Sequence, residues 1–343
     1  MASKNSLFIA TSLYSLFLFL LIKKNWEEID FVLYDRIPKP IIESMKKQGL
    51  SVFYIKTGLG VFSGIYARLV QFLISNFEFI RYLFNRKFRK YISVYGNDEL
   101  SISVLYWNKG IVLIEDGIFN YKSEHFFIKR QKSLMNKISI WSLFTFYLNV
   151  KYIPYGYSNQ VKKIFLTGEA ALPEALIDKV EVINIRNLWK AKSENEKCDI
   201  MRLFSIDRSI VECLHNYTSI LLTQPIAQDE DGTIPELEKI EIYKKILINI
   251  DEERLIIKTH YAEKTNYRKY FGKALIIDQP IPFQLFDLLD YHPTKVITIS
   301  STAALKFSRS NSELIFTGTE IDHRIVKMYG VININNLTGS YTI

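Results

Sequence analysis

Residues 7–22 read Leu-Phe-Ile-Ala-Thr-Ser-Leu-Tyr-Ser-Leu-Phe-Leu-Phe-Leu-Leu-Ile, and the stretch Asp30-Phe-Val-Leu-Tyr34 follows them. Leu7–Ala10 is typical of a buried strand, Thr11-Ser12 of a turn and helix cap, and Leu13–Ile22 of a buried helix. Asp30–Tyr34 then reads as a second strand. The start of the chain therefore predicts a β-α-β unit.

A membrane anchor or a signal peptide is the alternative for this apolar run. A transmembrane helix needs roughly 20 apolar residues, whereas this run is interrupted by Thr11, Ser12 and Ser15. A signal peptide would need a basic start and a small-x-small cleavage site. Only Lys4 precedes the run, and no Ala-x-Ala site follows it. We therefore favour the strand–helix unit.

The same alternation of short apolar runs with longer helical stretches continues along the chain. Candidate strands in the first half are Val52–Lys56, Tyr91–Tyr95, Gly110–Glu115, Lys163–Thr167 and Val180–Ile185. Those in the second half are Ile220–Pro225, Arg254–His260, Ala274–Asp278, Lys295–Ser300 and Glu313–Thr317. Helical patterns cover Val61–Arg81, Leu134–Phe146, Pro235–Asn249 and Pro282–Asp290. Continuously apolar strands that alternate with helices indicate parallel sheets covered on both faces.

The two halves are separated by a charged stretch, Arg186 to about Ser219, which reads as a connection of exposed helix or loop. The sequence therefore predicts an α/β protein with two facing Rossmann-like domains, residues 1–205 and residues 206–343. One helix gives a specific expectation about the core. Leu237, Ile240, Tyr243 and Leu247 fall on one face of Pro235–Asn249, so we expect all four to be buried.

Composition limits the classes of protein that this chain can belong to. The 343 residues are 48% hydrophobic and 23% charged, which suits large cores and excludes global disorder. The two cysteines, Cys198 and Cys213, are too few for a disulfide framework or a Cys-rich zinc site. The formal net charge of +8 favours an anionic partner such as a nucleotide, an acidic glycolipid or a membrane surface. Nucleic acid would also fit the charge, but no recognition motif for it is present, so we expect none.

Polar residues follow three of the predicted strands, where ligands bind in open α/β sheets. The three clusters are Glu115-Asp116-Gly117, Lys258-Thr259-His260 and Ser300-Ser301-Thr302. The first offers a carboxylate base next to a permissive glycine, although alone it could be an ordinary acidic turn. The second offers a histidine and a lysine to a leaving phosphate, although alone the histidine could be structural. The third offers hydroxyls and backbone N–H groups at a helix N-terminus, although alone it could be a plain helix cap.

Taken together, the three clusters predict a cleft enzyme that moves an anionic leaving group. The basic aromatic run Arg81–Arg89 could lie on anionic lipid, hold an acidic acceptor, or be a solvated helix end. Asp229-Glu230-Asp231 has the spacing of a metal-binding DxD pattern, but it precedes Gly232 in a polar loop. We interpret it as a solvated loop and expect no metal or other cofactor.

The order of the three clusters resembles that of bacterial sialyltransferases. These are the lipooligosaccharide sialyltransferases of glycosyltransferase family 52 and their capsular polysialyltransferase relatives. The opening Leu7–Tyr14 resembles their first strand and helix. The blocks that resemble their nucleotide-binding half are Ile220–Pro225, Ile256–His260, Ile281–Phe283 and Ile297–Ala304. The resemblance implies a GT-B fold, in which residues 1–205 form the acceptor side and residues 206–343 bind the nucleotide sugar.

Two positions depart from the family pattern. His260 is followed by Tyr261 where the family often has proline, and Gln284 stands where it often has glutamate. A glutamate can hold a ribose, and a glutamine would do so more weakly, so both departures concern how the nucleotide is bound.

The resemblance also implies a chemistry. The donor would be CMP-sialic acid, the acceptor a glycan ending in galactose or sialic acid, and the anomeric carbon would be inverted. Asp116 would deprotonate the acceptor hydroxyl, with its pKa raised by Glu115 nearby. His260 would stabilise or protonate the departing phosphate of CMP. The residues expected to contact substrate besides these two are Glu115, Gly117, Lys258, Pro282, Phe283, Gln284, Ser300, Ser301 and Thr302.

Two other functions stay open at this point. One is a GT-B transferase of another sugar, such as Kdo from CMP-Kdo or a hexose from a UDP-sugar. The other is a non-catalytic, membrane-associated module of capsule assembly, which would use the apolar N-terminus and the basic surface. The substrate class and the basic charge predict a cytoplasmic protein at the inner face of the bacterial membrane.

Overall fold

The computed structural model describes residues 4–56, 77–78, 80–82, 84, 91–128, 153–226, 234–301, 303–304 and 312–334. The chain forms two compact units, Met1–Lys197 and Cys198–Ile343. The boundary predicted from the sequence, between residues 205 and 206, lies a short way further along the chain.

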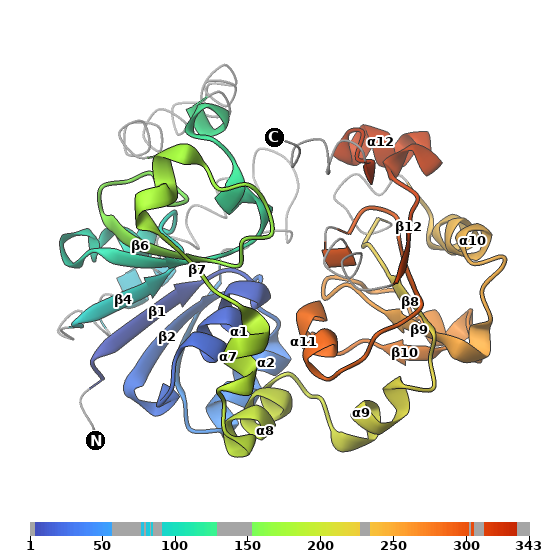
Figure 1. Ribbon diagram of the computed structural model, residues 1–343, viewed down its shortest axis with the longest axis horizontal. Coiled ribbons are helices and arrows are strands. Elements are labelled where there is room, and N and C mark those ends of the chain that lie inside the picture. Colours follow the sequence, from blue (N-terminus) through green and yellow to red (C-terminus); the bar gives the residue numbers. More distant parts are fainter. Residues whose placement is uncertain are drawn as a thin grey trace. The chain divides into compact units, whose positions relative to one another are not determined.

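The first unit contains a seven-stranded parallel sheet in the order β3-β2-β1-β4-β5-β6-β7. Its strands are β1 (Ser6–Ala10), β2 (Ile29–Tyr34), β3 (Ser51–Ile55), β4 (Ser93–Gly96), β5 (Ile111–Ile114), β6 (Val161–Leu166) and β7 (Val180–Val182). The chain starts in the middle of the sheet, runs to one edge and returns to place β4 on the other side of β1. In such doubly wound sheets, ligands bind where the direction reverses, here between β1 and β4 (Figure 1).

Within the described residues, the helices of this unit include α1 (Leu13–Ile22), α2 (Lys39–Lys47), α4 (Ser101–Val104) and α7 (Ile185–Lys190), and α8 (Glu194–Leu203) crosses into the second unit. Short 3-10 turns are η1 (Trp26–Glu28), η2 (Trp107–Lys109), η3 (Ile118–Tyr121) and η4 (Glu174–Lys179).

Helix α1 confirms the strand–helix interpretation of the N-terminal apolar run. The Ser12 hydroxyl caps it by accepting a hydrogen bond from Ser15 N at 3.0 Å. The helix is buried on nearly every face and packs against α7 and β5. Figure 1 shows α1 next to α7. Phe19 stacks on Phe8 of β1 with ring centroids 4.0 Å apart. A helix that is apolar all round is stable in this setting because it is enclosed by the rest of the unit. No helix in the described part of the chain is long and apolar enough to cross a membrane.

The second unit contains a five-stranded parallel sheet in the order β10-β9-β8-β11-β12. Its strands are β8 (Ser219–Leu222), β9 (Leu255–Lys258), β10 (Leu275–Ile277), β11 (Lys295–Thr298) and β12 (Glu313–Phe316). Its helices are α9 (Arg208–Leu214), α10 (Glu236–Ile246), α11 (Phe283–Leu288) and α12 (His323–Tyr329), with 3-10 turns η5 (Glu252–Arg254), η6 (Tyr267–Lys269) and η8 (Thr319–Ile321). The winding reverses between β8 and β11. The prediction of two Rossmann-like α/β halves is confirmed.

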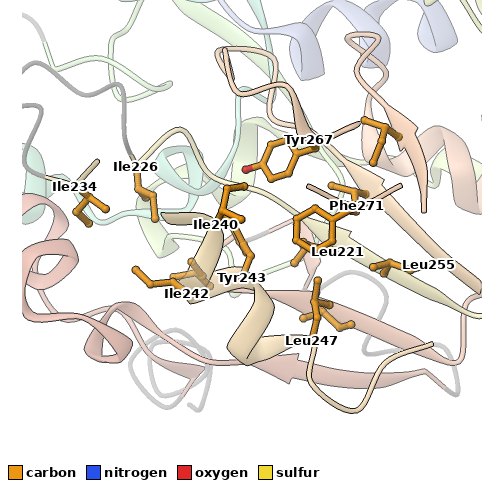
Figure 2. Close-up of a cluster of buried hydrophobic side chains, with 14 of the residues drawn as sticks. Leu221, Ile226, Ile234, Ile240, Ile242, Tyr243, Leu247, Leu255, Tyr267 and Phe271 are labelled. Carbon is orange, nitrogen blue, oxygen red and sulfur yellow. The ribbon is translucent and has the colours of Figure 1, made fainter. Parts of the chain in front are cut away.

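The core of the second unit lies between this sheet and α10. Figure 2 shows Ile240, Tyr243 and Leu247 of this region in one cluster with Leu221 and Tyr267. The prediction that Leu237 is also buried is wrong, because this side chain is 66% exposed. The helix begins at Glu236, so Leu237 lies in its first turn and does not reach the cluster.

Two other sequence expectations change or fall outside the described residues. The stretch 186–219 is not a simple connection, because α7, α8 and α9 bury Trp189, Ile200, Leu203 and Leu214. The helix predicted over Leu134–Phe146 lies outside the described residues. That over Val61–Arg81 lies mostly outside them, and the described residues 77–78 and 80–81 are helical.

Candidate functional site

The reversal point of the first sheet is fixed by an unusually close approach of two strands. Gly96 ends β4 with φ 115°, and a Cβ at this position would lie 1.8 Å from the carbonyl oxygen of Ile9 in β1. Only glycine fits such a contact. The next residue, Asn97, donates its backbone N–H to the Ile9 carbonyl (2.8 Å), and its Oδ1 accepts from Thr11 N (3.2 Å). This arrangement holds Asn97 beside the N-terminus of α1.

Asp116 follows β5, the next strand of the sheet, and is half-buried. Its backbone N–H donates to Oδ1 of Asn120 at 2.7 Å. Burial raises the pKa of the Asp116 carboxyl to about 6, and hydrogen bonding from Ser12, the charge of Arg36 and hydrogen bonding from Asn97 oppose the rise. The sequence also predicts a raised pKa for Asp116, but the cause is burial and not the charge on Glu115. A carboxylate with this pKa is suited to accept a proton near neutral pH.

Glu115 is 1% exposed and has a different environment from its neighbour. Its Oε2 accepts hydrogen bonds from Thr167 N (2.6 Å), Thr167 Oγ1 (2.7 Å) and Tyr121 OH (3.0 Å). The carboxylate thereby joins the end of β5 to the end of β6. Gly117, with φ 135°, allows the turn into η3. Of the two adjacent acids, Asp116 is therefore the more accessible to a substrate.

In the second unit, the loop after β9 is anchored to both neighbouring strands. Thr259 N donates to the carbonyl of Ile277 in β10 (3.0 Å), and His260 N donates to Thr223 Oγ1 after β8 (3.1 Å). Lys258 is only 6% exposed, and its Nζ donates to the Thr259 carbonyl at 2.6 Å. Burial lowers the pKa of the Lys258 ammonium to about 8, against the opposing charge of Asp278. A mostly charged ammonium thus lies under the His260 loop at neutral pH.

The imidazole of His260 is held in one tautomer. Its Nδ1 accepts a hydrogen bond from Ala262 N at 3.2 Å, which leaves the proton of the neutral ring on Nε2. Burial, reinforced by the charge of Lys258 and opposed by Glu263, lowers the pKa of His260 to about 4. The ring is therefore neutral at pH 7. It can stabilise an anion by donating its Nε2–H, whereas protonation of a leaving group would require a rarely populated imidazolium.

A buried polar network behind this loop could not be found from the sequence. Lys239 on α10 is fully buried and pairs with Glu263 Oε1 at 2.8 Å, and its Nζ also donates to Thr265 Oγ1 at 2.5 Å. Tyr267 OH donates to the other oxygen of Glu263 at 3.0 Å. Since Glu263 N donates to the His260 carbonyl (2.9 Å), the network fixes the turn that carries the imidazole.

The third predicted cluster follows β11, on the other side of β8. Ser300 and Ser301 are half-buried, and Ser301 N donates to Thr298 Oγ1 at 3.0 Å. Thr302 lies outside the described residues, as does most of the helix predicted to begin at Ser301. The strand order places the ends of β9, β8 and β11 next to one another. His260 and the two serines therefore follow strands that flank the same central strand.

The fourth predicted group begins α11, which follows β10. Pro282 and Phe283 are buried, and Phe283 packs on Phe286 with ring centroids 5.9 Å apart. Gln284 is half-buried. Of these three residues, Gln284 has the side chain most accessible to a ligand. Asp229–Asp231, the DxD-like stretch, lies outside the described residues.

Comparison with known proteins gives a consistent result. The sequence profile of glycosyltransferase family 52 matches residues 35–323. An uncharacterized protein of Haemophilus influenzae is 33% identical over 320 residues, which cover 92% of this chain and 95% of that protein.

Among solved structures, an α/β-galactoside α-2,3-sialyltransferase of Photobacterium phosphoreum matches with TM-score 0.52 and 13% identity, over 95% of each chain. The GT-B domain of a Photobacterium damselae sialyltransferase matches with TM-score 0.52 and 11% identity, over 94% of this chain and 95% of that chain. A 2,6-sialyltransferase of Photobacterium sp. JT-ISH-224, in a complex with CMP and lactose, matches with TM-score 0.52 and 14% identity, over 94% of this chain and 75% of that chain. At these identities the structural matches establish the GT-B fold.

Proposed function

Because the chain belongs to glycosyltransferase family 52, we propose that it transfers sialic acid from CMP-sialic acid to a hydroxyl of a cell-surface glycan, with inversion at the anomeric carbon. The glycan would belong to lipooligosaccharide or capsule. Residues 1–205 would bind the acceptor, and residues 206–343 would bind the donor.

The observation that carries this proposal is the contrast between the two sheet ends. The first unit presents Asp116, a carboxylate whose pKa of about 6 suits a base. The second presents the neutral Nε2–H of His260 above the buried ammonium of Lys258, together with Ser300 and Ser301. A base and an anion site are the two requirements for moving a phosphate-activated sugar onto a hydroxyl.

The proposed reaction uses these groups in one displacement. Asp116 takes the proton of the acceptor hydroxyl. At the same time, the oxygen of that hydroxyl bonds to the anomeric carbon of the donor. The bond from that carbon to the phosphate oxygen of CMP breaks, and its electron pair stays on the phosphate. His260 donates its Nε2–H to this oxygen, Lys258 supplies positive charge, and the two serines donate hydroxyl hydrogen bonds.

The nucleotide would be held beyond the phosphate by residues of the second unit. Gln284 would contact the ribose, with Pro282 and Phe283 supporting the start of α11. Tyr261, which replaces the usual proline, lies 4.3 Å from the His260 ring between centroids. It would therefore shape the wall next to the phosphate. Thr302 would be a further phosphate ligand. Gly117, in the turn that follows Asp116, would contact the acceptor.

Peripheral contact with an anionic membrane is a further part of the proposal. Phe77, Ile80 and Phe84 are each in helical conformation and are exposed. Basic residues Arg86, Lys87, Arg89 and Lys90 follow directly in the sequence. Exposed apolar side chains beside a basic run suit the interface of an anionic bilayer, where a glycolipid acceptor would reside.

The test is a transfer assay with purified protein, CMP-sialic acid and lactose, with the anomeric configuration of the product determined by NMR. We expect a sialylated product of inverted configuration. Preferential use of CMP-Kdo or a UDP-hexose would keep the family and reject the donor. No turnover with any of these donors, together with normal capsule or lipooligosaccharide in cells carrying Asp116→Ala, would favour the non-catalytic assembly role.

A further inference from the structure

Three buried polar atoms lie at the substrate end of the first sheet with no hydrogen-bond partner among the residues that the structure describes. They are Oδ1 of Asp116, Oε2 of Glu99 and Nδ2 of Asn120. A buried polar atom that nothing bonds to destabilises the folded protein, so a group of three such atoms calls for a functional explanation.

The three side chains belong to one cluster. Asn120 Oδ1 accepts the backbone N–H of Asp116 at 2.7 Å, which also fixes the amide so that its Nδ2 is the free end. Glu99 follows β4, whose neighbour in the sheet is β5, the strand that leads to Asp116. Burial raises the pKa of Glu99 well above its usual value, and the nearby charges of Asp98 and Asp116 add to the rise.

Asp98, the residue before Glu99, is a buried acid with a clear structural role. Asp98 is fully buried, and its two carboxylate oxygens accept from Tyr155 N (2.9 Å) and Gly156 N (3.0 Å). It holds a loop in place and has no oxygen to spare for this purpose. Asn120 is just as buried, at 2% exposure, yet among the described residues only one end of its amide has a partner. No contact within the described residues therefore gives these free atoms a structural role.

Two carboxyl oxygens and one amide N–H donor match the hydrogen-bonding capacity of neighbouring sugar hydroxyls, which both donate and accept. We infer that Glu99 and Asn120 are specificity-determining residues that, together with Asp116, bind the hydroxyls of the acceptor sugar. The inference rests on the proposed function and adds two residues to it. A site whose buried polar groups need these hydroxyls would reject an acceptor that lacks them. The charges of Asp116 and Asp98 would also disfavour an acceptor sugar that carries its own carboxylate.

The test uses substitutions that keep each side chain's shape. Asn120→Asp retains the acceptor for Asp116 N–H and replaces only the free donor, while Glu99→Gln replaces one carboxyl oxygen with an amide NH2 group. Binding of lactose, N-acetyllactosamine and sialyllactose to the full-length protein with CMP present is measured by saturation-transfer NMR. We expect wild-type protein to bind the two neutral sugars in preference to sialyllactose. Each variant should bind them about tenfold more weakly or worse, with its affinity for CMP unchanged.

The matched controls are Asn108→Asp and Glu43→Gln, both at exposed positions of the same unit, and both should bind sugar as wild type does. Undiminished sugar binding by Asn120→Asp and Glu99→Gln would overturn the inference, as would wild-type protein that binds none of the sugars. A parallel loss of CMP affinity and thermal stability would also overturn it, since it would mean that the two residues are structural. Wild-type protein that binds lactose but transfers nothing from CMP-sialic acid would instead refute only the proposed function.

Discussion

Asp116 and Glu115 are adjacent in the chain, yet the structure gives them different surroundings. Glu115 is tied to Thr167 and Tyr121, whereas Asp116 has a buried oxygen without a partner in the described part of the chain. We predict that Asp116→Asn lowers the turnover number about 10²–10⁴-fold, the usual contribution of a general base, and leaves CMP affinity intact. Steady-state kinetics and calorimetric titration with CMP measure the two effects.

Glu115→Gln is the matched comparison. It removes the same charge from a carboxylate that accepts three hydrogen bonds, so it should lower the thermal midpoint more than it lowers turnover per folded molecule. If a folded Glu115→Gln protein loses turnover and Asp116→Asn retains it, the base is Glu115 and our assignment is wrong.

The pH dependence of kcat/KM provides a second prediction for these residues. Asp116 must be ionised to act as base, so activity should fall below its pKa of about 6. Lys258 must be protonated to supply charge, so activity should also fall above its pKa of about 8. His260 stays neutral throughout this range and adds no limb. Asp116→Asn should remove the acidic limb from its residual activity, and a profile that is flat between pH 5 and 9 would contradict both roles.

The same pKa predicts a change in stability. The folded pKa of Asp116 lies above its unfolded value, so its stabilising contribution is complete only below the unfolded pKa and is lost as pH rises through about 6. At pH 7.5, Asp116→Asn should therefore raise the free energy of unfolding by about 1–3 kcal/mol.

For single residues, the sequence predicts their position at a strand end better than it predicts their burial and contacts. The apolar runs before Asp116 and before His260 were enough to place both at strand ends, because polar residues that follow buried strands emerge at the sheet edge. Which of two adjacent acids is buried could not be predicted, since parallel strands covered on both faces show no alternating pattern. Glu99 was missed because only the pairing of β4 with β5 brings its loop to Asp116. Asn120 was missed because hydrophobic periodicity does not show the local turn in which its Oδ1 accepts the Asp116 N–H.

At the scale of elements, the contact between β1 and β4 is the most demanding one in the first unit. Gly96→Ala would place a Cβ 1.8 Å from the Ile9 carbonyl oxygen at a φ of 115°. We predict a loss of about 3 kcal/mol or more, seen as a lower thermal midpoint of the first unit or as insoluble protein. Gly49→Ala is the control, because Gly49 also has a positive φ of 78° but no atom within 4 Å of its Cβ position. It should cost about 1 kcal/mol. Equal effects of the two substitutions would mean that the close approach is not a constraint.

The elements themselves were largely predictable, and the exceptions have physical causes. Each predicted strand in the described part of the chain is present within a few residues, because apolar runs bounded by polar turns leave few other options. The hydrophobic pattern on α10 fails for one apolar and one charged residue. Leu237 is exposed, and Lys239 is buried because Glu263 and Thr265 satisfy its ammonium. Hydrophobic periodicity cannot detect a buried ion pair.

At the scale of the whole molecule, the repeated alternation of strands and helices was sufficient to predict two Rossmann-like halves and, through the resemblance, the GT-B fold. The division of labour between the halves depends on chemistry that the fold alone does not determine. It follows in this account from the base in the first unit and the anion-binding groups in the second.

The most direct test of this account is calorimetric titration of the purified protein with CMP, UMP and ADP. A protein that uses CMP-sialic acid should bind CMP tightly and bind UMP and ADP much more weakly. The phosphate site built from His260, Lys258 and the two serines should contribute to this binding. A preference for UMP or ADP would contradict the proposed donor, and the absence of binding to all three nucleotides would contradict the assignment of the nucleotide site.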